Sequence, residues 1–128
     1  MTSVLGATEY MMWASPPWDR VTIQVAIALH EQKSVRAFIN HNIPGLAITD
    51  AQGGAKSIGQ WVITHVSSGR CIPFVFTTLA DATRVMQYIG PMAVWTQSSV
   101  ELFTQEVLRK RVTDQCLSAH GVAIPATV

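Results

Sequence analysis

Histidine is the residue type in this chain best suited to metal binding or acid–base chemistry, and it occurs at positions 30, 41, 65 and 120. Zinc and metalloprotease sites need paired ligands at fixed spacing, such as HExxH on a helix. His30-Glu31 is followed by Gln-Lys-Ser, and no two histidines are close in sequence. We therefore expect scattered, hydrogen-bonded histidines, with no metal and no cofactor.

The two cysteines could supply a nucleophile if a histidine lay beside one of them. Cys71 and Cys116 do not form a CxxC pair. Cys71 begins an apolar run that is typical of a strand, and Cys116 falls on the apolar side of a predicted helix. Packed, inert thiols are usual at such positions. We predict two free, buried thiols rather than a disulfide or an active-site cysteine.

The carboxylates do not have the spacing of a catalytic pair, and the glycines do not have the spacing of a phosphate-binding loop. Glu101 and Glu106 are five residues apart and do not share a helix face. The segment 50–57 ends in Gly-Ala-Lys-Ser but lacks the GxxxxGK[ST] order of a phosphate loop, and it precedes a strand. We predict no catalytic residue, and a small enzyme whose site is assembled from distant residues is the third alternative for the function.

The clearest local structure lies in residues 59–89. Residues 59–66 and 71–77 are rich in β-branched and aromatic residues and flank the turn 67–70, which predicts a hairpin. Pro73 places the second strand at an edge or a bulge. Thr78 is expected to cap a helix that ends before Gly90-Pro91, with Asp81 in a shortened capping box.

This run resembles part of the three-strand-plus-helix DNA-binding modules found in the arm-binding domains of phage integrases. The resemblance covers about a quarter of the chain and rests on Trp61-Val-Ile-Thr-His-Val66, Ser67-Ser-Gly-Arg70 and Phe76-Thr-Thr-Leu-Ala-Asp-Ala82. Such modules carry several Lys or Arg on the sheet face to meet phosphates. This hairpin carries Arg70 alone, so the resemblance names no family.

A basic triplet, Arg109-Lys110-Arg111, occupies a predicted helix from about residue 100 to 119 that is capped by Ser98 or Ser99. Three adjacent helical residues point in different directions, which favours a solvated helix over a phosphate-binding stripe. Together with Arg70, the triplet supports the alternative that the chain binds nucleic acid. Binding is expected to be weak because the net charge is only +1.

The densest group of large apolar residues lies near the N-terminus and comprises Tyr10, Met11, Met12 and Trp13, with Trp18 nearby. Tyrosine, tryptophan and methionine are enriched in interface cores. We expect these residues to contact a protein partner or a second copy of this chain. The alternative is that the segment folds back onto the core of its own domain.

Segment 18–31 carries conflicting signals. Val21, Ile23, Val25 and Ile27 alternate as in a strand, whereas the Ser-Pro start and the lack of internal Gly or Pro favour a helix. We predict a helix, with a strand as the alternative. A short helix is also predicted from Ser34 to about Asn42, then a strand at 46–49. Irregular structure is expected at 1–14, a loop at 50–56 and a loose tail at 122–128.

Composition bounds the remaining possibilities. The chain has 128 residues, of which 48% are hydrophobic and 13% charged, which excludes disorder for most of its length. It shows no signal peptide and no apolar run long enough to span a bilayer, so we expect a cytoplasmic location and no membrane contact. We predict one α+β domain over residues 1–128. It should contain a small antiparallel sheet of three or four strands packed against three or four helices in a single pair of layers.

The predicted function is non-enzymatic protein binding. By analogy, a short chain without catalytic or targeting motifs is typical of accessory proteins of phages and plasmids. These include inhibitors of host defence such as anti-CRISPR proteins.

Overall fold

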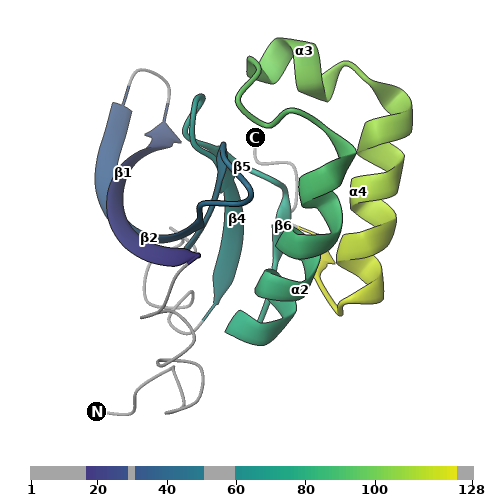
Figure 1. Ribbon diagram of the computed structural model, residues 1–128, viewed down its shortest axis with the longest axis horizontal. Coiled ribbons are helices and arrows are strands. Elements are labelled where there is room, and N and C mark those ends of the chain that lie inside the picture. Colours follow the sequence, from purple (N-terminus) through teal and green to yellow (C-terminus); the bar gives the residue numbers. More distant parts are fainter. Residues whose placement is uncertain (1–16, 29–30, 51–59, 124–128) are drawn as a thin grey trace.

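Five antiparallel strands that follow one another in chain order form the main sheet of the protein (Figure 1). The structure, a computed structural model, describes residues 17–28, 31–50 and 60–123. The strands of this sheet are β1 (Trp18–Ala28), β2 (Glu31–Asn40), β3 (Leu46–Asp50), β4 (Trp61–His65) and β5 (Arg70–Cys71). A second sheet pairs β6 (Phe74–Val75) with β7 (Val122–Ala123).

The two helices predicted before residue 45 are wrong, because both segments are strands. In β1 the alternating pattern of apolar residues matches the strand. Ile23 and Val25 are buried, whereas Thr22 and Gln24, which alternate with them, are exposed. In β2, consecutive apolar residues mimicked the spacing of a helix face. They are consecutive because this strand is buried on both sides, with Ala37 on one face and Phe38 on the other.

The predicted fold class is therefore corrected. The sheet has five strands rather than three or four, and a separate two-stranded sheet joins it, so strands outweigh helices in the described residues. The predictions at residues 1–14 and 51–56 lie outside the described residues.

The main sheet rolls up until its first and last strands meet, as the ring of strands in Figure 1 shows. The Ala26 amide of β1 donates a hydrogen bond of 2.8 Å to the carbonyl of Gly69, at the turn between β4 and β5. Small and branched side chains fill the inside of the roll. Ile23, Val25, Ala37 and Ala47 are buried there, and four half-buried residues pack against them: Val21, Val35, Ile39 and Val66.

The helices gather on one side of the rolled sheet (Figure 1). They are α2 (Leu79–Ile89), the 3-10 turn η2 (Gly90–Met92), α3 (Ser99–Phe103) and α4 (Glu106–Ser118). The main core unites them with the outer face of the strands. There the rings of Phe38 and Trp61 lie 6.0 Å apart, in one cluster with Met86 of α2 and Leu108 of α4.

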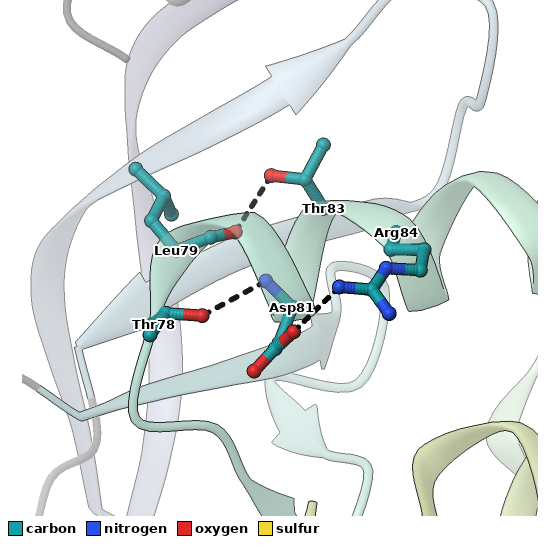
Figure 2. A network of polar contacts seen from close by, with 5 residues as sticks. All are labelled: Thr78, Leu79, Asp81, Thr83 and Arg84. Atoms are coloured by element: carbon teal, nitrogen blue, oxygen red, sulfur yellow. Dashed lines mark hydrogen bonds and ion pairs between the residues drawn. The ribbon is translucent and has the colours of Figure 1, made fainter. Parts of the chain in front are cut away.

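The start of α2 follows the sequence signal. The Thr78 hydroxyl caps the helix by accepting from the Asp81 amide at 3.1 Å. The Asp81 carboxylate accepts from Arg84 at 2.8 Å, and the Thr83 hydroxyl donates to the Leu79 carbonyl (Figure 2). The helix therefore begins where predicted. The Asp81 side chain forms its ion pair with Arg84, one turn further along the helix.

The predicted C-terminal helix is broken in two at Thr104 and Gln105. Leu102 and Leu108 are both buried, yet residues six apart in one helix point about 120° away from each other. The break lets both side chains reach the core. The predicted loose tail is also wrong in its first part, because Val122 and Ala123 pair with β6; residues 124–128 lie outside the described part of the chain.

Pro73 follows the edge strand of the main sheet, as expected, but the strand predicted over residues 71–77 is divided into the two short strands β5 and β6. The Ile72 amide still donates to the Ile63 carbonyl, but the Phe74 amide turns back to the Ile72 carbonyl at 2.7 Å. This tight turn centred on proline separates β5 from β6. Pairing with β4 then resumes between Trp61 and Phe76.

Gly45 gives a direct test of how the loop after β2 packs. Its φ is +99°, and a Cβ there would lie 2.4 Å from the backbone of Trp95. We expect Gly45→Ala to lower the free energy of unfolding by about 2–4 kcal/mol, because both backbone strain and the clash with main-chain atoms oppose it. Urea denaturation measures the change.

Gly90→Ala is the matched control. Gly90 has ordinary φ, and its added Cβ would meet the side chain of Ile43, which can shift. A loss of about 1 kcal/mol or less is expected there. Equal losses for the two variants would contradict the close backbone approach at Gly45.

Candidate functional site

The basic residues proposed for nucleic-acid binding do not share one surface. Arg70 is exposed on β5, and Arg109 lines a cleft beside Phe74. Lys110 and Arg111 are exposed on another side of α4, where they border a shallow depression together with two acidic residues, Glu106 and Asp114. The arrangement agrees with the expectation that the triplet forms no single basic stripe.

The predicted partner-binding residues divide into two groups. Tyr10, Met11, Met12 and Trp13 lie outside the described residues. Trp18 is only 7% exposed and belongs to the main core cluster, so its side chain is not part of an accessible surface.

His65 is a structural residue. It is fully buried on β4, and its Nε2 donates to the Gln97 carbonyl at 2.9 Å, because a carbonyl can only accept. Nδ1 is hydrogen-bonded to the Ser68 hydroxyl at 2.8 Å, and that hydroxyl accepts from the Arg70 amide. Both ring nitrogens are occupied, which leaves neither for proton transfer to a substrate.

The two thiols are free, but only one is buried as predicted. Cys116 has no exposed surface, and burial raises the pKa of its thiol to about 12. Cys71 is an exposed residue on β5, although packing around its sulfur also raises the pKa of the thiol. Cys71 is paired with Thr64, one residue before His65, so Cys71 and His65 point to opposite faces of the sheet and cannot form a nucleophilic pair.

The open end of the rolled sheet holds an apolar hollow of about 270 Å³, which we call the barrel mouth. Its walls are Val21 and Ile23 of β1, Ile39 of β2, Val66 after β4 and the loop that follows β2. The full lining is Val21, Ile23, Ile39, Asn40, His41, Ile43, Pro44, Gly45, Leu46 and Val66. Four of the aliphatic residues are only half-buried, so they offer apolar surface to whatever enters.

The rim of the barrel mouth is polar and fixed by hydrogen bonds. His41 Nε2 lies 3.4 Å from the Asp19 carboxylate, and both side chains are more than half exposed. The His41 amide donates to the Pro17 carbonyl, and the Asn42 amide donates to the Asn40 side chain. The exposed ion pair contributes little to stability, but it places one polar couple beside an apolar hollow.

The lining of the barrel mouth is mainly aliphatic. Its lining carries no thiol, hydroxyl or lysine nucleophile, and its polar side chains are one amide and one imidazole. Half-buried aliphatic walls with a few polar groups at the rim are typical of a site that accepts an apolar group and orients it. No three His, Cys, Asp or Glu residues of the described ranges are grouped to hold a metal ion.

Sequence reasoning missed the barrel mouth. The alternation of Val21, Ile23 and Val25 was the available signal, because it predicts one continuous apolar face once the segment is taken as a strand. The identity of the opposing residues, above all Val66, depends on how far the sheet rolls, and no local pattern carries that information.

Comparisons with protein-family models, with curated proteins and with solved structures find no match to this chain. The function must therefore be inferred from the residues and geometry themselves. Within the described ranges, every helix is too short or too polar to cross a bilayer.

The unequal burial of the two thiols leads to a measurable difference in reactivity. At pH 8, a thiol reagent should modify Cys71 of the folded protein, whereas Cys116 should react only after unfolding. Counting modified thiols by mass spectrometry before and after adding denaturant tests this. Fast modification of both thiols in the folded protein would contradict the burial of Cys116.

The same burial predicts a pH dependence of stability. In the unfolded chain the Cys116 thiol has its ordinary pKa of 9.0. In the folded chain the pKa of this thiol is about 12, so it keeps its proton to a higher pH. The unfolded state thus binds fewer protons above pH 9, so the free energy of unfolding should fall as pH rises through that range. Cys116→Ala should remove this part of the slope, and Cys71→Ala should change the slope less, because Cys71 is the more exposed of the two residues.

Proposed function

We propose that this chain is a non-enzymatic protein-binding module and that the barrel mouth receives an apolar side chain of the partner. The observation that carries the proposal is the hollow itself, with half-buried aliphatic walls and a polar rim. At about 270 Å³ it lies just below the range of drug-sized ligand pockets, and it suits one or two side chains. Apolar anchors that enter such pockets carry most of the energy of many interfaces.

The segment predicted to contact a partner, residues 10–13, precedes the rim of the barrel mouth in the sequence. Pro17, whose carbonyl accepts from the His41 amide, follows directly on residues 10–16 in the sequence. The proposed interface combines the mouth with this segment and leaves out Trp18, which lies in the core.

A finer proposal concerns the kind of partner, which can be a second copy of this chain or another protein. Scarce charge and a high apolar content favour protein contacts over nucleic acid. By the analogy drawn from the sequence, we propose a component of a host-defence complex as the partner. Finding a different class of host protein bound at the barrel mouth would overturn this finer proposal alone.

Val66→Trp is the sharpest test, because it places an indole in the mouth at a half-buried position. We expect the variant to melt within about 4 °C of the wild type but to lose its partner in affinity purification from the native host. Light scattering reports the same loss if the partner is a second copy.

Val107→Trp is the matched control, since Val107 is 74% exposed on α4 and should keep the partner. Met12→Ser combined with Trp13→Ser should stay folded and also lose it. A wild type that holds no protein, or a Val66→Trp variant that binds as tightly as the wild type, would contradict the proposal.

A further inference from the structure

A second hollow lies between the strand β6 and the helices α3 and α4, and it shares no residue with the barrel mouth. Its volume is about 120 Å³, and we call it the Arg109 cleft. The aromatic side chains of Phe74, Trp95 and Phe103 line it together with Leu108 and Val112. All of these except the half-buried Phe103 are nearly or fully buried, so the cleft has an apolar, preformed floor.

The floor of the cleft offers no free polar group from Trp95. The indole Nε1 of Trp95 donates to the Ile89 carbonyl at 2.9 Å, inside the core. The part of a ligand that reaches the floor must therefore be apolar, because a polar group there would lose its bonds to water without replacement. An engineered apolar cavity of about 150 Å³ holds benzene. This slightly smaller hollow, open on one side, suits one branched aliphatic chain or one ring that protrudes in part.

The rim of the cleft carries a positive charge. Arg109 lines the opening and is exposed, and Thr113, one helical turn further along α4, lines it as well. The ion pairs found among the described residues are Asp19–His41 and Asp81–Arg84, and neither involves Arg109. Its guanidinium is thus available to a ligand, and arginine matches the two oxygens of a carboxylate with two parallel hydrogen bonds.

We propose that the Arg109 cleft binds an apolar group of single-ring or branched-chain size that bears a carboxylate. The apolar part enters between Phe103, Leu108 and Val112, and the carboxylate pairs with Arg109 at the rim, within reach of the Thr113 hydroxyl. Two sources carry this chemistry: a free small acid and the C-terminal residue of a peptide.

The test titrates the full chain, labelled at methyl groups, with 3-phenylpropanoate. The methyl resonances of Leu108 and Val112 should shift saturably, with a Kd on the order of 1 mM, as expected for a ligand of this size. The neutral amide of the same acid, or Arg109→Gln, should weaken binding about tenfold, because each removes the charged pair.

Arg111→Gln is the matched control, since Arg111 borders a different depression on the same helix. The affinity of this variant for 3-phenylpropanoate should stay within about twofold of the wild-type affinity. A peptide that ends in leucine, with a free or an amidated C-terminus, distinguishes the sources: tighter binding of the free peptide assigns a chain end, and tighter binding of the small acid assigns a metabolite. Absence of saturable shifts, equal binding of acid and amide, or equal loss in Arg111→Gln would overturn the proposal.

Discussion

A backbone hydrogen bond from the Ala26 amide to the Gly69 carbonyl joins the first strand of the main sheet to the turn before its last strand, and the inner core and the barrel mouth depend on that closure. Gly69 permits it in two ways. Its φ of +73° suits glycine, and a Cβ at this position would lie 3.0–3.4 Å from the backbone of β1. Ala37 and Ala47 are the small members of the inner cluster, and they leave room inside the roll for Ile23 and Val25.

Closure of the sheet divides its residues between two cores. The inner face buries the aliphatic cluster that ends at the barrel mouth, and the outer face supplies Phe38 and Trp61 to the core shared with the helices. His65 fastens the two layers together. Its ring reaches Ser68 in the β4–β5 turn on one side and Gln97 ahead of α3 on the other, and it packs edge-on against Phe103 at 5.8 Å. The barrel mouth thus lies at the inner core, and the Arg109 cleft lies at the core shared with the helices.

Local signals predicted the parts of the fold that depend on few residues. The cap at Thr78, the cap at Ser98, the strand at Trp61–His65 and the edge position next to Pro73 all appear where the sequence placed them. Each rests on a preference of the residue itself or of its near neighbours, such as a hydroxyl that accepts an amide or a proline that cannot donate one.

The predictions that failed depend on distant partners. Phe38 and Ala37 are both buried because different layers cover the two faces of β2, and this produced a pattern that resembles a helix face. The burial of Trp18 in the main core likewise depends on residues that are distant in the sequence. The barrel mouth and the Arg109 cleft each combine residues from several elements, so neither candidate site could have been predicted before the rolling of the sheet and the break before α4 were established.

Amide hydrogen exchange measured by NMR tests directly whether the strands close into a roll with a formed mouth. Because successive amides of a strand point in opposite directions, those of Ala26 and Thr22 lie on the same outer edge of β1. Ala26 donates to Gly69, whereas Thr22 has no bond along that edge to any residue of the ranges 17–28, 31–50 and 60–123. We expect the Ala26 amide to exchange about a hundredfold more slowly than the Thr22 amide. Equal, rapid exchange at both positions would mean that the sheet is open, and it would contradict both the closure and the barrel mouth that depends on it.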